Sequence, residues 1–440
     1  MPTGGAKMVK NHITKKTLLA ALVLSALTVQ TAFAATMELN LNKAVHMALV
    51  NNSTIKISDA ELANAKALKD QAKGARWGSV TANSSNTRGG YYHYVNGDGT
   101  GPAGTFKNGL TVEFPLYSGG ALSGAIDKAS KNYEYYKYGM DESYQATKLS
   151  ATNGYYSVLE AANTVTLNKE SVNQLAEHLK NTQAQFNVGV VAKIDVLRSQ
   201  VELANAEQTL TKAKNTYDVA VATLNNIIGL PISTNLSVSE GLEYKPYNYT
   251  LDNCLTYAMA NRPEIHQAEA NVAMNKAAKK VANSGNMPSV GVSASTGWAN
   301  NAWPATKNDQ WSVGVTVSMN VWDYGVTAAK VAAAKANVVN AEETYRQTTD
   351  NVQLEVRTYY LSLREAEKRI STTSVAIAEA EEAYKIALVR YQAGVGTNTD
   401  VIDAQVSLTT AKNNYIQALY DYNTSHAKLE KAMGVPVLVD

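Results

Sequence analysis

Two pairs of charged residues follow turn-forming glycines at corresponding places in the two halves of the chain. The first pair is Asp195 and Arg198, and the second is Asp400 and Asp403. Asp400 and Asp403 lie at i and i+3, so on a helix they would share one face. Copies of such a face around a common axis would form rings of carboxylates, which favour cations. Two simpler interpretations stay open: Asp400 can be a helix N-cap, because Asp195 recurs at the matching place, and Asp403 can be a solvated surface charge.

Other chemistry-bearing residues do not assemble into a recognisable site. The single cysteine, Cys254, excludes a disulfide framework and any cysteine-based metal cluster. The 6 histidines are scattered and form no HExxH motif. With 40 Lys and Arg against 38 Asp and Glu, the chain lacks the basic excess of nucleic-acid-binding proteins. The sequence therefore predicts no enzyme, no metal, no cofactor and no nucleic-acid partner.

The elements that carry these residues occur twice. Residues 41–85 align without a gap on residues 251–295, and residues 110–231 align on residues 315–436. The register between the two alignments changes by 5 residues, which predicts a variable loop between Ser85 and Leu110. Internal repetition of this kind indicates duplicated structural units. We therefore divide the chain into a first repeat at 35–231, a linker at 232–250, a second repeat at 251–436 and a short tail at 437–440.

Each repeat predicts the same order of elements: a helix, a β-hairpin, a very long helix, a glycine turn and a last helix. A long helix of 67 residues would extend about 100 Å, and the two shorter helices could stack end to end beside it. The fold class is thus mostly α with added β-strands. The expected bounds are helices at 41–75 and 251–283, hairpins at 79–118 and 288–323, long helices at 121–187 and 326–392, and last helices at 195–228 and 400–433.

The strands alternate strictly between polar and apolar residues. In the last one, Ser312, Gly314, Thr316 and Ser318 alternate with valines, so one face is polar and the other apolar. A soluble sheet would need a cover for the apolar face, and no amphipathic segment is left over to supply it. We therefore predict a membrane β-barrel whose polar face lines a wet lumen. An interfacial aromatic girdle would consist of Trp298, Trp311, Trp322 and Tyr91 to Tyr94.

The N-terminus is predicted to be an export signal. Lysines 7, 10, 15 and 16 precede a short apolar run from Leu18 to Val29, and Ala32-Phe33-Ala34 is a cleavage pattern. The apolar run is too short to span a bilayer as a helix. Residues 1–34 are therefore expected to be removed, which leaves an exported chain that begins near Ala35.

Taken together, the chain resembles the TolC family of outer-membrane channel proteins over nearly all of its mature length. The resemblance rests on the hairpin tips at 186–196 and 391–401, on Pro115 to Gly120 and on Asn261 to Ile265. It implies a homotrimer with a 12-stranded barrel, four strands per chain, in outer-membrane lipid, continued by a helical coiled-coil barrel in the periplasm. It also implies a passive duct opened by a periplasmic adaptor (membrane fusion protein) and by an inner-membrane pump or ABC exporter.

The resemblance gives the tips their expected roles. The exposed turns would dock the adaptor, and their residues are Val188, Gly189, Val190, Ala393, Gly394 and Val395. The family often has a basic latch residue at the position of Gly396, so we hypothesise that Arg198 pairs instead with Asp403 or Asp400 of a neighbouring tip. A non-conducting tether across the periplasm and an exported helical adhesin are the competing functions.

Overall fold

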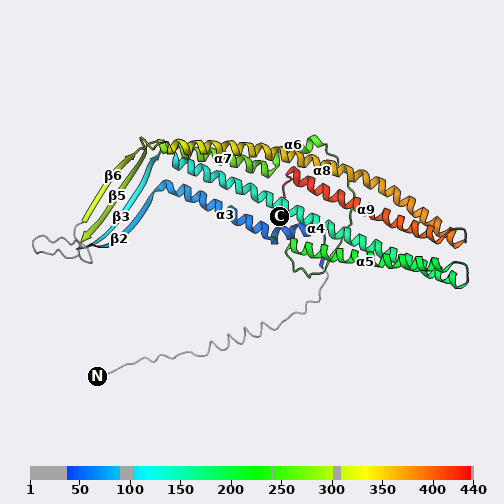
Figure 1. Cartoon of the computed structure of the whole chain (residues 1–440). Coiled ribbons are helices and arrows are strands. Elements are labelled where there is room, and N and C mark those ends of the chain that lie inside the picture. The colour runs from blue at the N-terminus through cyan, green and yellow to red at the C-terminus, as the bar shows by residue number, and fades with distance from the viewer. Residues whose placement is uncertain (1–36, 90–102, 240, 301–308, 438–440) are drawn as a thin grey trace, which may run out of the picture.

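The computed structural model describes residues 37–89, 103–239, 241–300 and 309–437. The predicted export signal and cleavage site, Tyr91 to Tyr94, and all but the first residue of the tail lie outside these ranges. The molecule is long and narrow, with a β-sheet at one end and two helical hairpin tips at the other (Figure 1). None of the helices among the described residues has a stretch long and apolar enough to cross a bilayer.

The sheet contains four antiparallel strands in the order β2-β3-β5-β6. Their bounds are β2 Ser79–Gly89, β3 Ala103–Ser118, β5 Ser289–Asn300 and β6 Asp309–Ser318. The last strand ends at Ser318 and not at the predicted 323, because Ser318 already lies opposite Ser289, the first residue of β5. Beyond it, the Asp323 carboxylate accepts the backbone N–H groups of Gly325 and Thr327 at 3.1 and 2.8 Å. These bonds turn the chain into the next helix.

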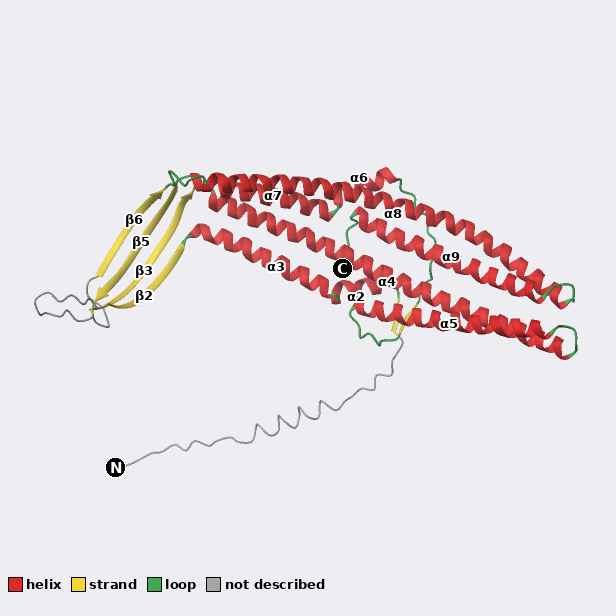
Figure 2. Cartoon of the chain, in the orientation of Figure 1, coloured by secondary structure: helices red, strands yellow, loops and turns green. Residues whose placement is uncertain are grey.

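The two long helices, α4 Ala121–Asn187 and α8 Val326–Gln392, have the predicted bounds. The last helices, α5 Lys193–Ile228 and α9 Asn398–Met433, each begin two residues before the predicted start. In the first repeat, α2 and α3 pack along one half of α4, and α5 packs along the other half. In the second repeat, α6 and α7 pack along one half of α8, and α9 packs along the other half (Figure 2). The predicted end-to-end arrangement of the shorter helices is confirmed.

The predicted first helix of each repeat is instead broken in two. The pieces are α2 Leu41–Asn51 and α3 Ser53–Gly74 in one repeat, and α6 Leu251–Asn261 and α7 Pro263–Asn283 in the other. Asn52 is extended and its side chain caps α3, while Pro263 opens α7 because it has no N–H to donate. Both breaks also cap a last helix: Asn52 Nδ2 donates to the Ile227 carbonyl at 3.0 Å, and Arg262 Nη1 donates to the Lys431 carbonyl at 2.6 Å.

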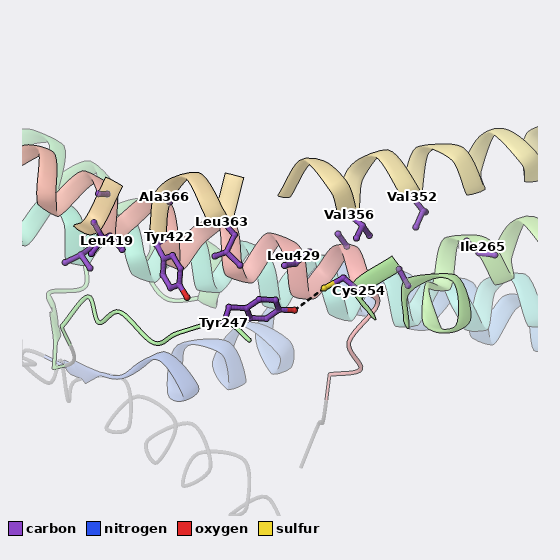
Figure 3. Close-up of a cluster of buried hydrophobic side chains, with 14 residues drawn as sticks. Tyr247, Cys254, Ile265, Val352, Val356, Leu363, Ala366, Leu419, Tyr422 and Leu429 are labelled. Atoms are coloured by element: carbon purple, nitrogen blue, oxygen red, sulfur yellow. Dashed lines mark hydrogen bonds between the residues drawn. The ribbon is translucent and has the colours of Figure 1, made fainter. Parts of the chain in front are cut away.

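The apolar cores lie midway along the molecule, near these breaks. In the core of the second repeat, Cys254, Tyr422 and Leu429 are buried, and the Tyr247 hydroxyl lies 3.5 Å from the Cys254 sulfur (Figure 3). Tyr422 also donates to the Lys245 carbonyl at 2.5 Å, which fixes the linker on the helices. The sequence did not reveal one small feature, a parallel pair formed by β1 Met37–Leu39 and β4 Leu236–Val238.

Candidate entrance and wall of a channel

Tight turns close the two helical hairpins at the end remote from the sheet. Gly189 and Gly394 adopt left-handed backbone conformations with φ of +81° and +74°. No atom lies within 4 Å of a Cβ added at either glycine, so the backbone conformation, and not lack of space, requires glycine there. The flanking Val188, Val190 and Val395 are exposed. The turns thus present small apolar side chains to solvent.

Asp400 has a defined local role beside the second turn. Thr397 is the N-cap of α9, its hydroxyl accepts the Asp400 N–H at 3.1 Å, and the Asp400 carboxylate accepts the Thr397 N–H at 3.0 Å. The hydrogen bond from the Thr397 backbone holds the pKa of the Asp400 carboxyl below its usual value. Asp400 is therefore the third residue of a capping box and not the N-cap itself. Asp195 has no such box, because Ala192 occupies the matching N-cap position.

Arg198 and Asp403 are both exposed on the helices that follow the turns. Within the one described chain, Arg198 Nη1 donates to the Thr399 hydroxyl at 2.8 Å and forms no ion pair with Asp400 or Asp403. The hypothesised pairing concerns a neighbouring copy, so it stays a prediction. Gly396 is packed closely, since an added Cβ would lie 3.0 Å from the Tyr391 nitrogen. A longer residue there would require the turn to shift.

A buried polar cluster, which the sequence did not reveal, joins the two hairpins just behind the tips. His178 Nε2 on α4 lies 2.6 Å from Asn398 Oδ1 on α9, and the Ser199 hydroxyl on α5 donates to the same oxygen at 3.2 Å. Asn398 Nδ2 donates to the Asp195 carbonyl at 3.1 Å. All three side chains are buried, and burial lowers the pKa of the His178 imidazole.

Tyr391 extends this cluster to α8, the fourth helix of the two hairpins. Its hydroxyl donates to the Thr182 hydroxyl at 3.3 Å, and its ring lies 5.3 Å from that of His178. The partners are about 200 residues apart in sequence, so no spacing rule could pair them. In the sequence, the only hint of this buried cluster is the pair of polar residues His178 and Thr182 within the long helix.

The sheet has the two faces that the alternation predicts. The polar residues of β6 lie opposite polar or small residues of β5, and the Ser295 and Ser312 hydroxyls are 2.8 Å apart. On the other face Val313 and Val315 lie opposite Ala294 and Val292. Next to the helices the same division continues across β3 and β2, where Val112 lies opposite Val80 and Thr111 opposite Thr81. Farther from the helices the apolar face becomes polar, since Asn108 of β3 lies opposite Ser84 of β2 on that face.

A two-faced sheet that continues into long paired helices, with hairpin tips at the far end, is the architecture of outer-membrane channel proteins with a periplasmic helical barrel. The chain belongs to the outer membrane efflux protein family, whose model matches residues 44–230 and 255–435. This family consists of channel proteins and not of enzymes. Membership places the sheet in the outer membrane and the helices in the periplasm.

Known relatives agree with this assignment. TolC of Escherichia coli is 24% identical over 305 residues, which are 66% of this chain and 62% of that protein, so the match spans less than two thirds of its length. The alkaline protease secretion protein AprF of Pseudomonas aeruginosa is 23% identical over 82% of this chain and 75% of its own. The crystal structure of the Campylobacter jejuni CmeC outer-membrane channel superposes with a TM-score of 0.83 at 18% identity, covering 90% of this chain and 85% of that one.

The buried imidazole of His178 predicts a pH-dependent stability. Because its pKa is lowered in the folded chain, the unfolded chain binds more protons below the ordinary value of about 6.5, and stability falls as the pH drops. The contribution is at most about 1.4 kcal/mol per pH unit. We expect His178→Gln to flatten the dependence of the unfolding temperature on pH between about pH 7.5 and about pH 5.

The exposed His46 on α2 provides the control, and His46→Gln should keep the wild-type pH slope. An unchanged slope in His178→Gln would show that the buried cluster does not couple protonation to folding.

Proposed function

We propose that three copies of this chain form a passive exit duct of a tripartite efflux pump or a type I secretion system. The observation that carries the proposal is the continuous polar face of the sheet, which runs across all four strands, opposite a face that is apolar next to the helices. The periplasmic adaptor and the inner-membrane pump or ABC exporter would open the duct. Residues 1–34 would direct export, and 35–231 and 251–436 would be the two repeats, joined by 232–250.

The number of copies follows from the number of strands. Bacterial barrels begin at about eight strands, and a barrel of that size is filled by its own side chains. Two copies of this sheet would give eight strands and three would give twelve, so a conducting lumen favours three. Single-channel recordings in planar bilayers test the function directly: the duct should conduct, whereas a non-conducting tether between the membranes should not.

The wall prediction concerns which residues face water. Ser312, Gly314, Thr316 and Ser318 should line the lumen, and the valines between them should face lipid, because they lie on opposite faces of β6. We expect a membrane-impermeant thiol reagent to label cysteines at the first set and to spare those at the second, in a Cys254→Ser background. Equal labelling of both sets would contradict the barrel.

The docking prediction concerns the hairpin turns. Gly189→Val or Gly394→Val should abolish adaptor-dependent export, because a β-branched residue does not adopt the left-handed conformation at the centre of the exposed docking surface. The other turn residues, Val188, Val190, Ala393 and Val395, flank the two glycines on that surface. The trimer should still reach the outer membrane.

Membrane fractionation and an export assay measure the two effects separately. Gly241→Val in the linker is the control, since nothing lies within 4 Å of a Cβ added there and its φ is ordinary. Normal export in both tip variants would refute the docking role.

The gate prediction concerns Arg198 and Asp403. On a threefold axis, Arg198 of one copy would pair with Asp403 or Asp400 of a neighbouring tip and so latch the closed state. Exposed pairs contribute about 0–1 kcal/mol each, so three of them could raise the ratio of closed to open channels by up to about a hundredfold. We expect Arg198→Ala to raise conductance, and Asp403→Ala to raise it while also weakening cation preference.

Asp218→Ala, which removes an exposed carboxylate of α5 far from the tip, should conduct like the wild type. The structure adds a second control, Thr399→Val, which removes only the contact of Arg198 within its own chain. Wild-type conductance and selectivity in both Arg198→Ala and Asp403→Ala would exclude the latch and the acidic entrance.

A further inference from the structure

Two charged residues interrupt the polar face of the sheet, and both belong to β3. They are Lys107 and Glu113. The other described residues that share this face across the four strands are neutral, and most are serine, threonine, glycine, asparagine or alanine. Lys107 lies near the start of β3, remote from the helices, whereas Glu113 lies toward the end that leads into α4. A small and neutral surface thus holds one cation and one anion at different heights.

The register of the strands places both charges on the polar face. Thr111, which lies opposite Ser295 on that face, is two residues from Glu113 and four from Lys107 along β3. Successive side chains of a strand alternate between faces, so residues separated by an even number share a face. The register shift in β3 comes only after Pro115, so this part of the strand is regular.

Neither charge has a counter-ion in the sheet of its own chain. The residues directly opposite them are neutral: Ser85 and Ala299 for Lys107, and Ser79 and Ser293 for Glu113. The two charges are six residues apart along β3, or about 20 Å, which is more than the Debye length of about 8 Å at physiological ionic strength. Both side chains are exposed. An ion pair within the sheet therefore does not account for them.

The duplication shows that these charges are particular to the first repeat. Ser85 lies opposite Lys107 in the first hairpin, and Ser295 lies opposite Ser312 in the second. Ser85 and Ser295 correspond in the alignment of the repeats, so Ser312 stands at the place of Lys107. By the same comparison, the glutamate of β3 corresponds to Ser318. Three copies would therefore present three charges at each of the two heights, separated by neutral positions.

We propose that Lys107 and Glu113 form two rings of opposite charge in the lumen of the barrel, and that the Lys107 ring transiently binds anionic groups such as phosphates and carboxylates. This inference rests on the proposed function in one respect, that the polar face of several copies lines one lumen. Ammonium groups around a lumen favour anions, and carboxylates favour cations. Because the two rings lie at different heights, an ion that crosses the barrel meets them in turn.

The surroundings of Lys107 leave room for an anion. Its neighbours on the same face include Gly109 of β3 itself, and Gly297 and Ala299 of β5. These are the smallest residues, so the ammonium group extends beyond the surface around it. Lysine binds phosphate as a point charge with three donors and requires no fixed geometry. A ring of such groups can therefore hold an anionic group and release it again.

Charged thiol reagents measure the potential at each ring in intact cells. In a Cys254→Ser background, Ser85→Cys lies beside the Lys107 ring and Ser293→Cys beside the Glu113 ring. Each variant is treated with an anionic or a cationic methanethiosulfonate, and the rates are normalised to those with free cysteine. In water, probes of opposite unit charge about 6 Å from an ammonium group differ about tenfold in local concentration. At low salt we expect a preference of about threefold to tenfold for the anionic reagent at Ser85→Cys, and the reverse at Ser293→Cys.

Neutral variants show whether the rings cause these preferences. Lys107→Gln should remove the anionic preference at Ser85→Cys, and Lys107→Arg should retain it. Arg88→Gln is the matched control, because Arg88 is a cation of β2 three residues from Ser85 but on the opposite face of the sheet. Equal normalised rates for both reagents at both cysteines would overturn the rings while the duct stands. Absence of labelling at both cysteines would contradict the lumen, and with it the proposed function.

Block by an anion tests binding in the unmodified protein. Pyrophosphate added to the barrel side of a planar bilayer should reduce the single-channel current of the wild type in a concentration-dependent way. We expect the concentration for half block to rise at least about tenfold in Lys107→Gln and to stay within about twofold in Arg88→Gln. A wild-type channel that conducts but is not blocked would overturn the anion site, and so would equal block in Lys107→Gln. A protein that does not conduct at all would instead contradict the proposed function.

Discussion

Unpaired backbone groups along β2 and β6 impose the constraint from which the rest of the architecture follows. An unsatisfied N–H or C=O costs several kcal/mol in hydrocarbon, so an open-edged sheet cannot enter a bilayer. The apolar face of the same sheet is equally unsuited to water. The chain satisfies both demands only when its two edges are paired, which the sheet order β2-β3-β5-β6 permits through further copies. In the proposed channel, the four described strands of each chain are therefore only part of the barrel.

Duplication gives both halves the same plan, while single residues adapt each half. The break in the first helix caps the last helix in both repeats, but with Asn52 in one and Arg262 in the other. The Asn52 side chain is neutral and therefore needs no ion-pair partner. The buried Arg262 guanidinium must be neutralised, and Glu264 and Glu355 do so at 2.7 and 2.5 Å. The same need, a donor for the carbonyls at the end of the last helix, is therefore met by a neutral amide in the first repeat and by an ion cluster in the second.

Sequence patterns predicted most of the fold because its elements are long and strongly periodic. The bounds of both long helices follow from flanking glycines, and the two faces of the sheet follow from strict alternation. The breaks at Asn52 and Pro263 were overlooked because the apolar pattern runs through them. The cluster of His178, Ser199 and Asn398 could not be predicted, since it joins three helices whose relative rotation is set by tertiary packing. Asp400 was recognised as a capping residue, but its partner Thr397 was not.

The distribution of contacts along the molecule suits an entrance that opens while the barrel stays closed. Near the middle, the hairpins rest on buried apolar side chains such as Leu224, Leu363 and Leu429. Toward the tips, buried apolar side chains such as Val401 remain, but polar contacts join the hairpins as well, as in the pair Gln174 and Gln405 at 2.5 Å. An apolar core loses its stabilisation when water enters, whereas each hydrogen bond exchanged for one with water costs only about 1 kcal/mol. In the proposed duct, separation of the tips would therefore cost less than the same movement nearer the membrane, which would expose the core.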